Sequence, residues 1–225
     1  LGQGDLDSAQ EARNRATCTR YLELAESYIR PRSPRLLIAC GLSGSGKSYM
    51  ARRLREALPL IHLRSDIERK RLFGISETMS TRASLDAGIY FPTATDWTYA
   101  RLLRLAEAIL GYGYDVLVDA TFICAARRAL FWDLARRHCT PVAILALDAP
   151  VDVLRNRIIC RRAENQDVSE ADVRVLERQR LALEPLASDE RAHAVFIDTS
   201  RTPPLAEVLE RIESAFVSVL APTEQ

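Results

Sequence analysis

A glycine-rich turn between an apolar run and a helix-forming run constrains this chain more than any other stretch. Residues 36–40 read LLIAC, and they lead directly into GLSGSGKS over residues 41–48. The turn fits the Walker A pattern G-x-x-x-x-G-K-[ST] without a mismatch, and it has the required context, a strand before it and a helix that begins inside it. Glycines let backbone N–H groups surround phosphate oxygens, and the helix N-terminus adds partial positive charge. The stretch therefore predicts a P-loop that binds a nucleotide.

Two side chains of this loop have expected roles of their own. Lys47 should reach the β- and γ-phosphates of ATP, and the Ser48 hydroxyl should bind Mg²⁺. Lysine occurs elsewhere only at Lys70, although the chain has 31 basic residues, so a lysine at this position stands out. The residues expected to bind ATP are Gly41, Leu42, Ser43, Gly44, Ser45, Gly46, Lys47, Ser48 and Tyr49.

Short apolar runs alternate with helical patterns after residue 34. Strands are expected at about 35–40, 60–63, 115–119, 142–147 and 194–197. Helices are expected at about 47–57, 66–72, 96–110, 125–138, 151–161, 170–183 and 205–219. This alternation is typical of βαβ units. It predicts an α/β fold with a parallel sheet that helices cover on both faces.

The same pattern suggests a domain organisation. Residues 1–34 are expected to form an N-terminal helix and linker, and 35–225 the P-loop domain. The N-terminal stretch is polar and then amphipathic, and two prolines end it. It fits either a helix packed on the domain or a connection to an upstream domain. Within the P-loop domain, 74–114 is expected to be a cap that binds the phosphate acceptor, and 161–172 a lid.

Composition bears on the possible partners, and nucleic acid is possible but not favoured. The formal net charge is only +1, so no strong overall field attracts nucleic acid or an anionic membrane. No apolar run approaches the roughly 20 residues of a membrane span. The five cysteines are odd in number and contain no CxxC pair, which is typical of a reducing compartment. A cytoplasmic protein without a membrane partner is expected.

Two aspartates follow expected strands at the edge where ligands bind in open parallel sheets. Asp66 stands after the second strand, where a carboxylate can accept the proton of an attacking hydroxyl. Asp119 ends the third strand, the place of a Walker-B-type carboxylate that holds Mg²⁺ directly or through water, and Thr121 follows it. Each aspartate has an ordinary alternative role, Asp66 as a helix cap and Asp119 as a turn residue.

Arginines recur in the stretch before the expected lid. Arg157 and Arg161 are four residues apart and therefore share one helical face. The polar sequence AENQDVSEAD follows at 163–172 and suits a mobile lid. Arginines on a lid can neutralise the charge that builds up on a transferred phosphoryl group. A solvated basic helix face would show the same spacing.

Four segments together resemble the AAA_33-type predicted P-loop kinases: GLSGSGKS, LRSDIERKRLFG, VLVDATF and LRNRIICRRAENQDVSEADVRVLERQ. In particular, they resemble the kinase module behind an aminoglycoside-phosphotransferase-like domain in some bacterial proteins, over about residues 20–220. The resemblance implies a fold like that of nucleoside monophosphate kinases, with five parallel strands in the order 2-3-1-4-5 and an arginine lid. It also implies an upstream aminoglycoside-phosphotransferase-like partner, joined through residues 1–30.

A more distant resemblance is to the kinase domain of polynucleotide kinases. There, an aspartate after the second strand, with an arginine three residues on, handles the 5′-hydroxyl. Asp66 and Arg69 have this spacing, and the resemblance makes both of them, with Thr121, candidates for substrate binding.

The expected cap adds aromatic side chains that sugars or bases could stack on, although most of them fit the core of the cap equally well. They are Tyr90, Phe91, Trp97 and Tyr99, with Arg82 beside them.

Three functions remain open. The favoured one is an ATP- and Mg²⁺-dependent kinase that acts on a hydroxyl of a nucleoside, sugar or aminosugar. The others are a 5′-hydroxyl polynucleotide kinase, which Arg64, Arg69, Lys70, Arg71 and Arg82 would serve as a local basic track, and a regulatory ATPase module.

Overall fold

The computed structural model describes residues 10–22, 33–76, 89, 91–164 and 172–220. The chain divides into two compact units, Leu1–Ser33 and Pro34–Gln225. In the first unit, residues 10–22 are helical; the rest of the expected amphipathic stretch lies outside the described residues. The second unit is the α/β fold.

The second unit is built on one parallel sheet of five strands in the order β2-β3-β1-β4-β5. The strands are β1 (Leu36–Cys40), β2 (Leu60–Arg64), β3 (Asp115–Asp119), β4 (Val142–Asp148) and β5 (Ala194–Asp198). The predicted sheet and its order are confirmed. Because all strands are parallel, their carboxyl ends lie along one edge of the sheet.

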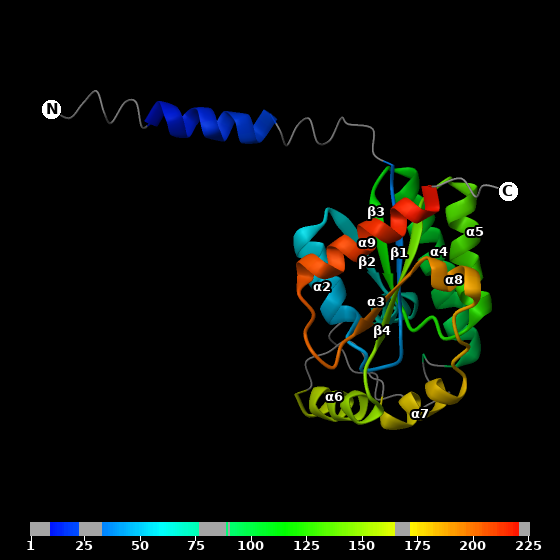
Figure 1. The fold of residues 1–225 in the computed structure, drawn as a ribbon. Coiled ribbons are helices and arrows are strands. Elements are labelled where there is room, and N and C mark those ends of the chain that lie inside the picture. Colours follow the sequence, from blue (N-terminus) through cyan, green and yellow to red (C-terminus); the bar gives the residue numbers. More distant parts are fainter. Residues whose placement is uncertain (1–9, 23–32, 77–88, 90, 165–171, 221–225) are drawn as a thin grey trace. The chain divides into compact units, whose positions relative to one another are not determined.

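Eight helices of this unit are described, and most connect consecutive strands (Figure 1). They are α2 (Lys47–Ala57), α3 (Ser65–Leu72), α4 (Pro92–Gly111), α5 (Ala125–Arg137), α6 (Val151–Glu164), α7 (Val173–Leu181), α8 (Ser188–Ala192) and α9 (Leu205–Leu220). Helix α4 begins four residues earlier than expected, because Pro92 suits the first turn of a helix. The short helix α8 was not predicted.

Apolar side chains cover both faces of the sheet. On β1, Ile38 belongs to the core cluster with residues of α4 and α5, whereas Leu37 belongs to the cluster with residues of α2 and α9. The five residues of β1 are all buried, as expected for a central strand of a two-sided parallel sheet. A third, smaller cluster joins the loop residue Leu42 to α6 and α7. Figure 1 shows α6 and α7 together at one end of the sheet. The third cluster therefore fixes the P-loop to the helices that cover it.

No helix in the described part of the chain is both long and apolar enough to span a membrane.

A fully buried arginine ties α5 to the segment that follows α7. Arg128 Nε donates to Glu190 Oε1 at 2.6 Å, and its Nη atoms donate to the carbonyls of Phe122, Glu184 and Pro185. The Arg128 side chain is 0% exposed. Its loss would leave the buried Glu190 carboxylate and the buried Phe122 carbonyl without this donor.

Replacing Arg128 with methionine should therefore lower the free energy of unfolding by about 3–5 kcal/mol, the usual scale for breaking a buried pair by removing one partner. Urea denaturation followed by circular dichroism measures this. Arg136→Met, on the same helix with a side chain 78% exposed, is the matched control and should change stability by less than about 0.5 kcal/mol. Equal effects of the two substitutions would show that the buried network does not contribute to the free energy of unfolding.

Candidate active site

The P-loop has the backbone that a phosphate-binding turn needs. Gly44 and Gly46 have φ angles of 82° and 84°, in the left-handed region that other residues rarely adopt. A Cβ on Gly44 would also lie 2.8 Å from the Leu154 carbonyl oxygen of α6. Gly46 is the N-cap of α2, and no side chain caps that end. The first N–H groups of α2 are therefore directed into the loop, where they can bind an anion.

The ammonium group of Lys47 lies inside this loop. Its Nζ donates to the carbonyls of Gly41 and Leu42, both at 2.8 Å. Burial lowers the pKa of Lys47 below its ordinary value, although the negative charges of Asp119 and Asp66 oppose this; the charge of Arg161 adds to the lowering. Three other predicted site residues, Asp119, Asp66 and Arg161, therefore act electrostatically on the Lys47 ammonium.

Asp119 joins the end of β3 to the start of α2. Its Oδ2 accepts from the Ser48 hydroxyl at 2.7 Å and lies 3.3 Å from His62 Nε2. The Arg64 Nε is 3.9 Å from the same oxygen. Burial alone would raise the pKa of Asp119, but the hydrogen bond from His62, the nearby charge of Lys47 and the Ser48 hydroxyl together lower it. Asp119 is therefore held as a carboxylate although it is almost fully buried.

A hydroxyl beside a buried carboxylate is a pair of hard oxygen donors, the kind that Mg²⁺ prefers. No group of three or more acidic, histidine or cysteine side chains that could hold a metal occurs among the residues the structure describes. Mg²⁺ is usually held by one or two protein oxygens plus substrate phosphates. Ser48 and Asp119 fit such an ion.

Asp66 lies in the first turn of α3, next to the end of β2. The N-cap of α3 is Arg64, and no side chain makes a capping hydrogen bond there. The alternative that Asp66 serves only as a cap therefore has no support. Asp66 is half-buried, and no hydrogen bond to its carboxylate occurs in the described part of the chain. Since β2 neighbours β3, Asp66 stands at the same edge as Asp119.

The turn after β3 places Thr121 against the loop. The Thr121 carbonyl accepts from Gly41 N–H at 3.1 Å. The next residue, Phe122, is fully buried and has a φ of 48°, a strained conformation for a bulky side chain. Its N–H donates to the Tyr99 hydroxyl at 3.1 Å, and its carbonyl accepts from buried Arg128 at 2.9 Å. Tyr99 is thus a core residue that supports this turn.

The two predicted lid arginines lie differently. Arg157 Nη1 donates to the Thr199 hydroxyl at 3.0 Å and to the Gly44 carbonyl at 3.3 Å, and its Nη2 donates to the Thr199 carbonyl. Arg161, one turn further on, is the arginine whose charge acts on Lys47. Residues 165–171 of the expected lid lie outside the described residues. Arg157 therefore contacts the loop at Gly44 and the segment after β5 at Thr199.

Two other candidates are not brought to this cluster. Arg69 is 8% exposed and donates to the Ile89 carbonyl at 3.1 Å and to the Thr95 hydroxyl at 3.2 Å. Its guanidinium therefore joins α3 to the start of α4. Tyr49 is 46% exposed on α2, where the guanidinium groups of Arg52 and Arg53 lie over its ring.

Sequence reasoning missed three residues that contact the site. His62 reaches Asp119 from β2, and Thr199, just after β5, donates to the Ser45 carbonyl at 3.0 Å. Gln179 of α7 accepts from Ser43 N–H at 2.8 Å. His62 lies inside β2 and Gln179 inside α7, and only Thr199 directly follows a strand. The sequence marks none of the three, because polar residues at such positions are common and their contacts depend on the tertiary fold.

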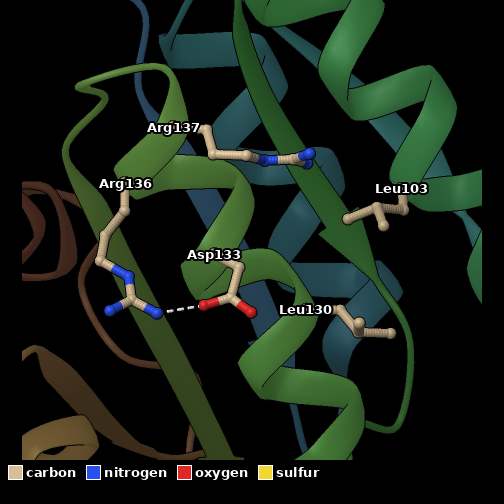
Figure 2. A pocket seen from close by; sticks show the side chains of 5 residues that line it. All are labelled: Leu103, Leu130, Asp133, Arg136 and Arg137. Atoms are coloured by element: carbon tan, nitrogen blue, oxygen red, sulfur yellow. Dashed lines mark hydrogen bonds and ion pairs between the residues drawn. The ribbon is translucent and has the colours of Figure 1, made fainter.

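A hollow outside this cluster lies between α4 and α5 (Figure 2). It has a volume of about 460 Å³ and is lined by Leu103 of α4 and by Leu130, Asp133, Arg136 and Arg137 of α5. Asp133 and Arg136 form an ion pair on one side of it, and the two leucines lie on the other (Figure 2). None of the predicted site residues lines this hollow, so it is separate from the P-loop.

Comparison with known proteins adds to this geometry. The AAA_33 family, described as an AAA domain, matches residues 36–186, which is more than half of the chain and contains every predicted site residue. The chain belongs to the AAA_33 family. An uncharacterized protein of Mycobacterium tuberculosis is 29% identical over 169 residues, which are 75% of this chain and 33% of the relative. An uncharacterized protein of Mycobacterium bovis matches equally. This AAA_33 chain therefore spans about a third of the length of the curated relatives it matches.

Solved structures show the same fold. A provisionally named kinase of Chloroflexus aurantiacus has a TM-score of 0.64 at 20% identity, over 83% of this chain and 98% of that one. The APS kinase of Mycobacterium tuberculosis, solved with AMPPNP and APS, has a TM-score of 0.55 at 19% identity, over 81% and 99%. Kti12 of Chaetomium thermophilum, solved with ADP-AlF3, has a TM-score of 0.59 at 18% identity, over 80% and 98%. The AAA_33 chain therefore has the fold of P-loop kinases.

Proposed function

We propose that this chain is an ATP- and Mg²⁺-dependent phosphotransferase that moves the γ-phosphate to a hydroxyl of a small molecule such as a nucleoside, sugar or aminosugar. The observation that carries the proposal is Asp66. A P-loop with Ser48 and Asp119 serves any ATPase, but a phosphotransferase also needs a base for its acceptor. Asp66 supplies a carboxylate at the same edge of the sheet, without a capping role and within range of the Lys47 charge.

In the proposed mechanism, the loop amides and the α2 N-terminus bind the phosphates of ATP. Lys47 would leave the carbonyls of Gly41 and Leu42 and bind the β- and γ-phosphates. Ser48 and Asp119 would hold Mg²⁺, which neutralises phosphate charge when bound. Asp66 would orient the acceptor hydroxyl and take its proton as the hydroxyl oxygen attacks the γ-phosphorus. Arg161, with Arg157, would stabilise the charge of the group in transfer.

The remaining segments have proposed roles as well. Residues 74–114 would form the acceptor cap, with 77–88 and 90, and so Arg82 and Tyr90, outside the described residues. Trp97 of the cap is 52% exposed, so a ligand could stack on its ring. Residues 161–172 would form the lid. The greater length of the mycobacterial relatives supports the proposal that this module works beside a further, upstream domain.

The polynucleotide kinase alternative loses part of its sequence support. Three of the five cations of its basic track lie on α3. Arg69 and Lys70 are 8% and 2% exposed, and Arg71 pairs with Glu68 at 2.6 Å. Buried and paired cations do not attract a phosphate backbone. A small-molecule acceptor is therefore the better proposal.

The test is transfer of label from γ-labelled ATP with Mg²⁺. Acceptors would be offered by class: nucleosides, sugars, aminoglycosides and 5′-hydroxyl oligonucleotides. We expect label on one small-molecule class and no transfer after the metal is removed with EDTA. Label on the oligonucleotide alone would favour the polynucleotide kinase. Label released only to water would favour the regulatory ATPase.

A further inference from the structure

The P-loop makes one contact that neither the loop motif nor the proposed mechanism accounts for. The backbone N–H of Ser43 donates to the side-chain carbonyl Oε1 of Gln179 at 2.8 Å, across 136 positions of sequence. The donor is a peptide N–H, so only the oxygen end of the carboxamide can face it. The orientation of the Gln179 side chain is thereby fixed by the loop itself.

Helix α7, which carries Gln179, is capped at its start and packed against the P-loop cluster. At its start, Asp172 accepts from Val175 N–H at 2.9 Å as an N-cap. Along its length, Leu176 is fully buried in the cluster that contains the loop residue Leu42. A side chain on such a helix can be placed accurately enough for a functional contact.

The segment that follows α7 is fixed to the turn after β3. The Glu184 N–H donates to the Ile123 carbonyl at 2.9 Å, and the Glu184 carboxylate accepts from Ala125 N–H at 2.6 Å. Buried Arg128 holds the Glu184 and Pro185 carbonyls in addition. Helix α7 therefore bridges the P-loop and the turn that carries Thr121.

The other half of the carboxamide makes no hydrogen bond to the described residues. In the part of the chain that the structure describes, the Nε2 of Gln179 has no hydrogen-bond partner, and it is not among the buried side-chain atoms without one. It remains accessible beside the loop. Lys47 Nζ sits on the carbonyls of Gly41 and Leu42, the two residues directly before Ser43. Gln179 is thus at the end of the loop where Lys47 is expected to meet the terminal phosphate.

We propose that Gln179 is a further catalytic residue, which anchors itself on the Ser43 amide through Oε1 and donates from Nε2 to the γ-phosphate of ATP. This inference rests on the proposed function. Such a contact distinguishes ATP from ADP, because ADP has no phosphate at that position. It would also let the helix beside the proposed lid respond to the terminal phosphate.

The test compares binding of ADP and of the non-hydrolysable analogue AMPPNP, both with Mg²⁺, by calorimetry on the full chain. Gln179→Met keeps the length of the side chain and removes both hydrogen bonds. Gln179→Glu keeps an acceptor for Ser43 N–H and removes the donor. We expect both variants to bind AMPPNP about tenfold or more weakly, the scale of one hydrogen bond to a charged group, and ADP within about threefold of the unchanged protein. Leu181→Ala, 90% exposed on the same helix, is the neutral control and should bind both as before.

Three results would overturn the inference. A parallel loss of AMPPNP and ADP affinity would mean that Gln179 only shapes the loop. Unchanged AMPPNP affinity in Gln179→Glu would mean that its N–H groups are not used. If the unchanged protein bound neither nucleotide, the proposed function itself would be wrong, and the inference with it. The first two results, in contrast, would refute only the role of Gln179.

Discussion

Replacing Lys47 with alanine is expected to lower phosphate transfer from ATP by about 10³-fold or more. Removal of one charged donor from developing negative charge costs about 10²–10³ in rate, and Lys47 is also expected to contribute to ATP binding. The lysine is the one ammonium inside the described loop. Burial lowers its pKa, and the negative charges of Asp119 and Asp66 partly oppose this lowering. Steady-state transfer of γ-label to the accepted substrate would measure the loss.

The control for this substitution is Arg55→Ala. Arg55 is an exposed cation in the last turn of the same helix, so its removal changes the net charge equally and leaves the loop intact. Transfer should stay within about twofold. Thermal unfolding of Lys47→Ala should change little, because water can replace the ammonium as the donor to the carbonyls of Gly41 and Leu42. Near-normal transfer by a folded Lys47→Ala protein would mean that the ammonium serves only the loop's own carbonyls.

The fold was predictable where its signals are local. Apolar runs and helical spacing located every strand, because parallel strands buried on both faces are nearly continuous apolar segments. Strand order is a non-local property, and it was available only through the resemblance to P-loop kinases. Helix α8 was missed because it has five residues and little apolar pattern. Its Glu190 is buried only because Arg128, 62 positions earlier, pairs with it, and no local pattern shows such a pair.

The site was predictable where a motif or a strand end marks it. The loop residues follow from their spacing, and Asp66 and Asp119 follow from the rule that ligands bind at the carboxyl edge of a parallel sheet. The partners of these residues depend on register and helix direction. His62 reaches Asp119 because β2 and β3 pair with Arg64 opposite Asp119, and Gln179 reaches Ser43 because α7 returns across the loop. Arg69, which matched a kinase spacing, is instead buried against Ile89 and Thr95.

Replacing Asp66 with asparagine should lower transfer by about 10²-fold or more, the usual scale for loss of a general base. The carboxamide keeps the size of the side chain but cannot take the acceptor's proton. Because no hydrogen bond to Asp66 exists within the described part of the chain, and no cap depends on it, stability should change by less than about 0.5 kcal/mol. Calorimetry with AMPPNP should show nearly unchanged binding, so the effect would fall on the rate and not on nucleotide affinity.

The comparison that decides the role of Asp66 is between transfer and hydrolysis. Asp152→Asn, whose side chain is 90% exposed on α6, removes the same charge away from the loop and should leave both rates unchanged. If Asp66→Asn loses transfer but still releases label to water at the original rate, the carboxylate acts on the acceptor hydroxyl, as the phosphotransferase mechanism requires. If the unchanged protein and Asp66→Asn release label only to water and at equal rates, Asp66 does not act as a base toward an acceptor hydroxyl. The P-loop would then work as a nucleotide-operated module whose output goes to another domain.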